Sequence, residues 1–269
     1  MENQHEQQIG VLDSGLGGLT VVRELKCLLP DESIVYIGDN ANCPYGNRSR
    51  EEILNLAQAM LAFLEKKNIK IAAIACNTIS ILAQELRQRY KFPIVSIIEE
   101  ACKFVAGQNF SQVGVFATEF TIKAGLYTTL IKRRSPKTNV YGVSSRTLAA
   151  LVEEDRYNEN AARAEVSSMT ELLLKAHPDI KHAVLGCTHY PHVQYLFEEA
   201  APDISFINPA AHQAEAIKAL LSERGLLSEK TLPRLDIYTS GGKLQYEEAV
   251  KKMNIRRPHT ISIIECPPV

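Results

Sequence analysis

Two cysteines stand where apolar runs of the sequence end, and small polar residues follow each of them. In "KIAAIACNTIS" (70–80) the apolar run leads into Cys76, and in "KHAVLGCTHYP" (181–191) a similar run leads into Cys187. A cysteine thiol has a pKa of about 8.5 in free solution, and this pKa falls toward about 7 at a helix N-terminus or beside a cation. Because general acids and bases work best with a pKa near the operating pH, both positions favour acid–base chemistry.

Two thiols on opposite walls of one site would allow the inversion of a carbon centre. Inversion through a planar carbanion requires one group to remove a proton and a second group to return a proton on the other face. Cys76 and Cys187 would supply one group to each face. A single cysteine near a histidine, as in Cys187-x-His189, would instead suggest nucleophilic catalysis by a hydrolase or transferase. That second interpretation leaves Cys76 without a role.

The other four cysteines receive different predictions. The six cysteines include no CxxC pair, so neither a zinc ribbon nor a thioredoxin-type motif is indicated, and no metal site is expected. Cys43 lies in the loop "NANCPYGN" and either lines the site or only lies near it. The remaining three are expected to be small core hydrophobes: Cys27, Cys102 and Cys266.

Further polar residues close other apolar runs. Asp13 and Ser14 follow "IGVL" and precede "GLGGLT", whose glycines match neither a P-loop nor the G-x-G-x-x-G spacing. This turn either presents backbone N–H groups to a carboxylate or is a turn with a serine as the N-cap of the next helix. In the second half, Thr118 and Thr121 either bind ligand oxygens or cap a helix.

The composition is that of an ordinary globular protein. The 269 residues are 45% apolar and 23% charged, which suits one large α/β domain or two average domains. The net charge of −1, without a basic block interleaved with aromatics, argues against a nucleic-acid surface. No signal peptide and no apolar run of about 18 residues occur, so we expect no membrane segment, a cytoplasmic location and reduced thiols.

Strand-length apolar runs alternate with helical patterns. In "SREEILNLAQAMLAFLEKK" (49–67), Ser49 and Glu52 fit a capping box, and apolar residues continue at helical spacing. This alternation predicts parallel sheets covered by helices on both faces. Four strand-like runs of the first half are "IGVLD" (9–13), "SIVYIGD" (33–39), "IAAIAC" (71–76) and "PIVSII" (93–98).

The second half of the chain repeats the first. Runs beginning at 113, 139, 182 and 204 echo the four strand-like runs in the same order, with offsets from 104 (113 − 9) to 111 (182 − 71). We therefore expect two similar doubly wound parallel-sheet domains in a pseudo-symmetric arrangement, with the active site in the cleft between them. Ligands of such sheets sit outside the carboxyl ends of the strands, where both cysteines stand.

The last segment has no counterpart in the repeat. A helix over 209–225 is indicated by Pro209 near its start and Gly225 just past its end. The run "LDIYTSG" (235–241) then follows, and we expect it to complete the first domain. The predicted domains are 1–99 plus 209–269, which supplies Cys76, and 100–208, which supplies Cys187.

With these residues assembled, the chain resembles the glutamate racemases of the cofactor-independent aspartate/glutamate racemase superfamily. The resemblance spans nearly the whole length and rests on "GVLDSGLGGLTV", "YIGDNANCPYG", "ACNT" and "LGCTHYP" in this order. It implies an isomerase that interconverts L- and D-glutamate without pyridoxal phosphate or a metal. It also implies a supply of D-glutamate for peptidoglycan, hence a part in cell-wall biogenesis and cell shape, and a homodimer.

The resemblance also implies a role for each matching residue. Cys76 would act on the D-enantiomer with help from Asp13. Cys187 would act on the L-enantiomer with help from His189 and an acidic residue of "LVEE", which is Glu153 or the adjacent Glu154. The implied substrate-binding residues hold the carboxylates and the amino group: Asp13, Ser14, Tyr45, Gly46, Asn77, Thr78, Thr118, Thr121, Thr188 and His189.

Two alternatives remain within and beyond this family. Aspartate could be the substrate, although aspartate-type members tend to place Glu where His189 stands, and one methylene distinguishes two acids by only about 1–3 kcal/mol. A regulator that binds an amino acid without turnover is the other alternative. Such a protein would be expected to lose one thiol, whereas this chain has both.

Overall fold

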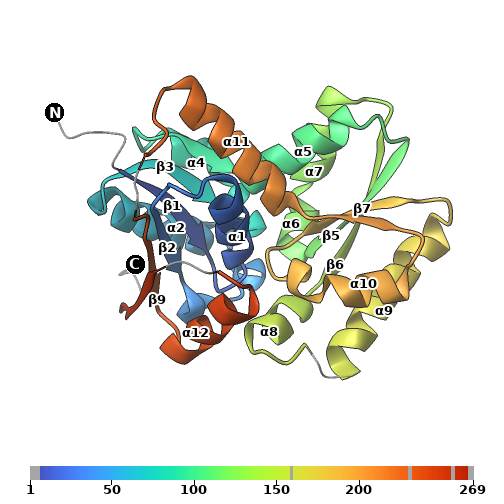
Figure 1. Ribbon diagram of the computed structural model, residues 1–269. Coiled ribbons are helices and arrows are strands. Elements are labelled where there is room, and N and C mark those ends of the chain that lie inside the picture. The colour runs from blue at the N-terminus through green and yellow to red at the C-terminus, as the bar shows by residue number, and fades with distance from the viewer. Residues whose placement is uncertain (1–6, 158–159, 230–231, 256–257, 266–269) are drawn as a thin grey trace.

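The apolar runs of the sequence form two parallel sheets in the computed structural model, which describes residues 7–265 except 158–159, 230–231 and 256–257 (Figure 1). Within these residues one sheet has six strands in the order β10-β9-β2-β1-β3-β4, and the other has four in the order β6-β5-β7-β8. The strands of the first sheet are β1 (Gln8–Asp13), β2 (Ile34–Gly38), β3 (Ile69–Ile74), β4 (Ile94–Ser96), β9 (Leu235–Thr239) and β10 (His259–Ile263). Those of the second are β5 (Gln112–Thr118), β6 (Asn139–Ser145), β7 (His182–Gly186) and β8 (Ser205–Ile207).

The strand order confirms the internal repeat predicted from the sequence. The order β2-β1-β3-β4 recurs as β6-β5-β7-β8, so each strand of the first half has its counterpart at the same place in the second sheet. The structure therefore contains two parallel-sheet α/β units with helices on both faces, which confirms the predicted fold class. Strands β9 and β10 extend the first sheet beyond β2, where β9 pairs with β2 in parallel. The residue bounds of the two domains stay a prediction.

Helices fill the connections between the strands. In the first half these are α1 (Leu19–Leu28), α2 (Arg50–Lys66), α3 (Asn77–Ser80), α4 (Ala83–Arg87) and α5 (Ile97–Gly107), with short 3₁₀ turns η2 (Asn40–Asn42) and η3 (Tyr45–Asn47). The second half contains α6 (Glu119–Ala124), α7 (Leu126–Arg134), α8 (Leu148–Glu153), α9 (Asn160–Ala176), η4 (Tyr190–Val193) and α10 (Gln194–Ala200). Helices α11 (Pro209–Glu223) and α12 (Lys243–Lys252) follow. No helix of the described ranges is long and apolar enough to cross a membrane.

Local sequence signals explain where the main helices begin and end. Ser49 accepts a hydrogen bond from the Glu52 N–H while the Glu52 side chain accepts from the Ser49 N–H, so the predicted capping box forms at the start of α2. Helix α11 begins at Pro209, and Gly225 follows its end at a φ of 62°, a left-handed conformation that glycine adopts without steric cost. Strand β4 ends earlier than the apolar run predicts, because Ser96 accepts from the Glu99 N–H and starts α5.

Helix α11 joins the two halves of the molecule. It packs against α1 beside the first sheet and against α5, which in turn packs against α7 of the second half (Figure 1). The core continues across this contact, since Val22 of α1, Ile217 of α11 and Val105 of α5 belong to one buried cluster. Burial of such side chains is worth about 1.5–3 kcal/mol each, so the shared cluster stabilises the placement of one sheet against the other.

The structural cysteines divide differently from the prediction. Cys102 is fully buried in the core, as expected. Cys27 is exposed, so its assignment to the core was wrong. The buried stripe of α1 consists of residues such as Val21, Val22 and Leu25, and position 27 falls on the other side of the helix. Cys266 lies outside the described residues.

Candidate active site

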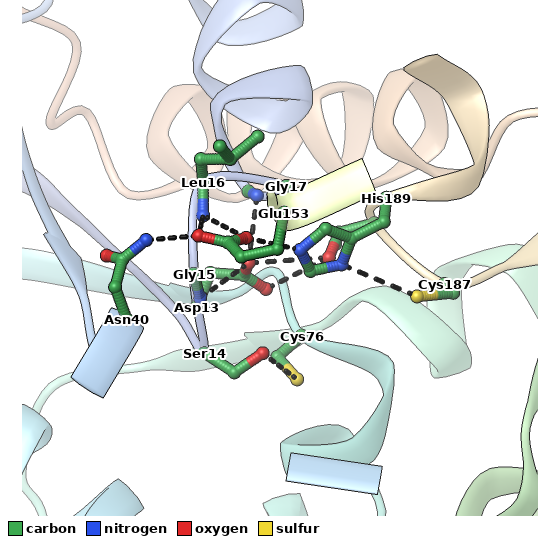
Figure 2. Close-up of polar contacts among 12 residues, drawn as sticks. Asp13, Ser14, Gly15, Leu16, Gly17, Asn40, Cys76, Glu153, Cys187 and His189 are labelled. Carbon is green, nitrogen blue, oxygen red and sulfur yellow. Dashed lines mark hydrogen bonds and ion pairs between the residues drawn. The ribbon is translucent and has the colours of Figure 1, made fainter. Parts of the chain in front are cut away.

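The two cysteines stand at corresponding strand ends of the two sheets. Cys76 is the N-cap residue between β3 and α3, and Cys187 follows β7, the counterpart of β3. Both are buried, with 5% and 6% of their surface exposed. Figure 2 shows the polar network around them, with residues of both sheets in it. The duplication has therefore placed one thiol at the carboxyl edge of each sheet.

The surroundings of Cys76 hold its thiol in the protonated form. Burial, and after it the nearby Asp13 carboxylate, raises the pKa of Cys76 to about 12, against the lowering effect of hydrogen bonds from the Ile79 N–H and the Ser14 hydroxyl. The Ser14 Oγ lies 3.6 Å from the Cys76 Sγ. Ser14 thus contacts the thiol rather than capping α1, whose N-cap is Gly18.

Asp13 links the glycine-rich turn of the first half to the second half. Its Oδ2 accepts the backbone N–H groups of Gly15 at 3.3 Å and Gly18 at 3.0 Å. The Thr188 hydroxyl donates to Asp13 Oδ1 at 3.2 Å. Burial raises the pKa of Asp13 to about 6, against the lowering effects of His189 and of the two backbone donors. The turn therefore presents N–H groups to a carboxylate, and this carboxylate belongs to the protein itself.

His189 faces the second thiol and is held by an acidic residue. Its Nδ1 lies 3.6 Å from the Cys187 Sγ, and its Nε2 lies 2.6 Å from the Glu153 Oε2. Burial, the largest influence, lowers the pKa of His189, but hydrogen bonds with Cys187, Cys43 and Glu153 together raise that pKa well above its usual range. A cationic imidazole in this position stabilises negative charge on the Cys187 sulfur.

Glu153 is fixed by groups from three other segments. Its carboxylate accepts the Leu16 N–H, at 3.0 Å to Oε2, and the Asn40 side-chain amide. Gln245 of α12 donates to its backbone carbonyl. The neighbouring Glu154 is exposed and pairs with Arg156 at 3.0 Å. Of the two acidic residues that the sequence left open, the structure brings Glu153 to His189.

Three predicted threonines form a short chain between the sheets. Thr78 and Thr118 hydroxyls lie 3.2 Å apart, and Thr118 and Thr121 hydroxyls lie 3.0 Å apart. Thr118 also caps α6 by accepting from the Thr121 N–H, and its hydroxyl group has this role whether or not a ligand binds. All three side chains are buried. Their hydroxyl groups can still offer hydrogen bonds to a carboxylate that enters between them.

The other predicted binding residues differ in the hydrogen-bonding groups that they leave for a ligand. Asn77 accepts from the Tyr127 hydroxyl at 2.7 Å, while its buried Nδ2 has no hydrogen-bond partner among the described residues. An unsatisfied buried donor of this kind favours a ligand oxygen. The Tyr45 hydroxyl donates to Asp39 at 2.6 Å. Gly46 approaches Thr118 so closely that a Cβ would lie 2.6 Å from the Thr118 Cβ.

One residue of the network, Asn40, was not singled out by the sequence analysis, and a second, Cys43, was left open between lining the site and lying near it. Asn40 bonds to Glu153 through its amide, and its Oδ1 accepts from Thr239 and Tyr246, both at 2.7 Å. Cys43 approaches His189 and Glu153. Both residues lie in "GDNANCPYG", a polar stretch directly after a predicted strand. Such stretches gather at the carboxyl edge of a parallel sheet, so this position is the sequence feature that could have identified them as site residues.

These observations define an α/β protein with two buried thiols, one from each half of a duplicated parallel-sheet architecture. Comparison with known proteins then gives the family. The model of the Asp/Glu/Hydantoin racemase family matches residues 9–217, and the chain belongs to this family. It is therefore an isomerase of the racemase class, as the resemblance predicted.

Individual relatives agree with this membership. The chain is 32% identical over 238 residues to the glutamate racemase of Limosilactobacillus reuteri, with 88% of each chain covered. The crystal structure of a glutamate racemase isoform from Bacillus anthracis matches with a TM-score of 0.89 at 30% identity, covering 98% of this chain and 100% of that one. A glutamate racemase from Francisella tularensis in complex with D-glutamate matches with a TM-score of 0.88 at 29% identity, covering 97% and 98%.

Proposed function

We propose that this racemase interconverts L- and D-glutamate, with Cys76 and Cys187 as the two acid–base groups. The observation that carries the proposal is the pair of buried thiols at equivalent ends of β3 and β7, each with a different polar partner. Asp13 and Ser14 accompany Cys76, whereas His189 and Glu153 accompany Cys187. The choice of glutamate is supported by the glutamate racemases to which the chain is similar.

Turnover from L to D begins at Cys187. The thiolate of Cys187 takes the α-proton of L-glutamate, the C–H electron pair remains as a carbanion, and the proton becomes part of the Cys187 thiol. The Cys76 thiol then donates its proton to the opposite face and is left as a thiolate. Exchange of protons with solvent restores the starting state. The raised pKa of Cys76 and the cationic His189 beside Cys187 favour this starting state.

Turnover from D to L requires the opposite protonation of the two thiols. Cys76 must then act as the base, and a proton must leave its buried sulfur. Asp13, whose pKa of about 6 lies near neutrality, is suited to exchange protons there. The roles of Asp13 and of the His189–Glu153 pair are thus proposed to match the two directions of the same reaction.

Hydrogen-bond donors around the thiols are proposed to hold the substrate. The unsatisfied Nδ2 of Asn77 and the hydroxyls of Thr78, Thr118 and Thr121 would bind its carboxylate oxygens. Such donors also stabilise the negative charge that spreads onto the α-carboxylate when the proton leaves. Ser14, Thr188 and the backbone at Tyr45–Gly46 would complete the binding site.

The proposal extends to the setting of the enzyme. We propose a cytoplasmic homodimer that supplies D-glutamate for peptidoglycan, and through it contributes to cell-wall biogenesis and cell shape. Reduced thiols are required for the reaction, which agrees with a cytoplasmic location, where disulfides are rare. Size-exclusion chromatography with light scattering checks the dimer.

The test is an incubation of the purified protein, without added cofactor, with L-glutamate and separately with L-aspartate in D₂O. We expect loss of optical activity and incorporation of deuterium at the α-carbon for glutamate. Turnover of aspartate instead of glutamate would contradict the proposed substrate but would still support proton transfer by the two thiols. Exchange with neither acid would overturn the proposed reaction.

A further inference from the structure

Cys43, Glu153 and His189 form a cluster with the donor atoms of a metal site. One ligand atom from each residue, a thiol sulfur, a carboxylate oxygen and an imidazole nitrogen, lies within 4.8 Å of the other two. Glu153 and His189 are buried, and Cys43 is partly buried in the loop between η2 and η3. Cys43 takes no proton from the substrate in the reaction proposed above, and its link to that reaction is its hydrogen bond with His189.

We propose that Cys43, Glu153 and His189 bind a Zn²⁺ ion, and that this ion inhibits the enzyme. Zinc is borderline soft and takes sulfur, nitrogen and oxygen ligands in a tetrahedral site. Thiolate and imidazole ligands disfavour Mg²⁺ and Ca²⁺, which prefer oxygen. Three protein ligands leave a fourth position for a water molecule.

The cluster needs only a modest adjustment to reach zinc geometry. With bonds of about 2.0–2.3 Å, ligand atoms of a tetrahedral site lie roughly 3.3–3.8 Å apart. Every separation in the cluster is below 4.8 Å, and the 2.6 Å pair of Glu153 Oε2 and His189 Nε2 must open to reach this spacing. Cys43 is carried by a loop, where such an adjustment is least costly. Binding releases to solvent the thiol proton of Cys43 and the proton held between His189 and Glu153.

Neighbouring groups support Glu153 as a ligand. The Leu16 N–H and the Asn40 amide donate to its carboxylate, and hydrogen bonds of this kind orient metal ligands and keep them in place. The Asp13 carboxylate acts electrostatically on both His189 and Cys43. A cation entering this buried site therefore meets two carboxylates in addition to the thiol and the imidazole.

Inhibition follows from what the ion would occupy, and this part rests on the proposed function. A bound Zn²⁺ takes the imidazole and the carboxylate that assist Cys187, so proton removal from the L-enantiomer should stop. Binding of the ion to the cluster, by contrast, does not depend on the identity of the substrate. The two parts can therefore be tested separately.

Binding is measured first, with Zn²⁺ in competition with a chromophoric chelator and with Co²⁺ as a spectroscopic probe. We expect one Zn²⁺ per chain and an intense near-ultraviolet thiolate-to-cobalt band. In Cys43→Ser and Cys43→Ala both signals should weaken, the affinity by at least about 100-fold, since loss of a mere hydrogen-bonding neighbour of a ligand already costs about 10–100-fold. Cys27→Ser, which alters an exposed cysteine of α1, should bind as the wild type does.

Inhibition of racemisation is measured on the same variants. We expect both Cys43 variants to require at least about 100-fold more Zn²⁺ for half-inhibition than the wild type, with each rate taken relative to the metal-free rate of the same variant. Equal affinity in wild type and Cys43 variants would place the ion on the catalytic thiols and overturn the site, as would an absence of binding to the wild type. If binding follows the expectation but glutamate is not turned over, the proposed function fails and the metal site stands.

Discussion

Glu153 Oε2 lies 2.6 Å from His189 Nε2, and the same imidazole faces the Cys187 sulfur through Nδ1 at 3.6 Å. The two residues are 36 positions apart in the chain, and Glu153 is in turn held by Leu16 and Asn40 of the first half. A carboxylate that is fixed by N–H donors and bound to an imidazole keeps the imidazole charged and oriented. The acid–base group at Cys187 is therefore assembled from both halves of the molecule.

Replacement of Glu153 should impair the half of the reaction that begins at Cys187. Glu153→Gln keeps the size of the side chain and removes its charge, so the pKa of His189 should fall and the cation beside Cys187 should persist only to a lower pH. We expect kcat with L-glutamate to drop by about 100-fold, at the low end of what acid–base groups contribute. Steady-state rates over a pH series measure this.

Glu154→Gln is the matched control for that substitution. Glu154 is exposed and pairs only with Arg156 among the ion pairs of the described residues, so its replacement should leave the rate within about twofold, as for most surface changes. A large loss in Glu154→Gln with little change in Glu153→Gln would reverse the assignment of the assisting acid.

Single replacement of each thiol should separate the two directions of the reaction. In Cys76→Ser, Cys187 can still remove and return the α-proton on its own face, so L-glutamate should exchange its α-hydrogen with D₂O without inversion. In Cys187→Ser the same should hold for D-glutamate. Racemisation should fall by at least about 100-fold in both. Nuclear magnetic resonance of each enantiomer follows the exchange, and equal exchange of both enantiomers in either variant contradicts the assignment of one thiol to each face.

Much of this arrangement could be predicted from the sequence, because it depends on features that repeat along the chain. The apolar runs and their four ordered echoes predicted two parallel sheets, and the observed orders β2-β1-β3-β4 and β6-β5-β7-β8 confirm the repeat. Cys76 and Cys187 were placed at strand ends by the polar residues that follow them. The alternation of apolar runs and helical patterns is a local property of the chain, so it can be recognised in the sequence without knowledge of the fold.

The rest depends on tertiary contacts that no local pattern encodes. Asn40 meets Glu153 across 113 positions, and Tyr246 of α12 across 206, because β9 and α12 return beside β2. The choice of Glu153 over Glu154 depends on which side of α8 faces His189. Cys27 was placed in the core because its type suits a core, whereas the rotation of α1 exposes it.

The stability of the protein should depend on pH through Asp13. Burial raises its pKa from 3.8 to about 6, so between these values the folded protein binds more protons than the unfolded chain does. The free energy of unfolding should therefore fall as the pH rises from 4 to above 6, by about 3 kcal/mol for a shift of this size. Asp13→Asn cannot titrate and should lack this contribution. Urea unfolding of both proteins across this range measures the difference, and parallel curves would contradict the raised pKa.

Asn40 should matter through the position of Glu153. Asn40→Ala removes one donor to the Glu153 carboxylate and one acceptor for Thr239 and Tyr246. We expect a loss of about 1–3 kcal/mol in the free energy of unfolding, since buried polar groups lose their partners. The pH profile of the L-to-D rate should shift in the same direction as in Glu153→Gln. Asn42→Ala, which alters the same 3₁₀ turn at a side chain bonded to Asp39, should not shift that profile.

Close packing of the glycine-rich turn against the second half should make Gly17 sensitive to a single methyl group. A Cβ on Gly17 would lie 2.6 Å from the Thr188 hydroxyl oxygen and 2.9 Å from the Thr188 backbone carbon. The backbone atom cannot move without displacing His189, and Thr188 also donates to Asp13. Gly17→Ala should therefore cost about 1–3 kcal/mol of stability, as overpacking commonly does, and should lower kcat in both directions.

Gly107→Ala is the control, because a Cβ there meets no atom of the described residues within 4 Å. Its stability should stay level or rise by up to about 1 kcal/mol, since alanine restricts the unfolded chain. If Gly17→Ala unfolds and turns over like Gly107→Ala, the two halves must separate more freely at this contact than the close approach of Gly17 and Thr188 requires.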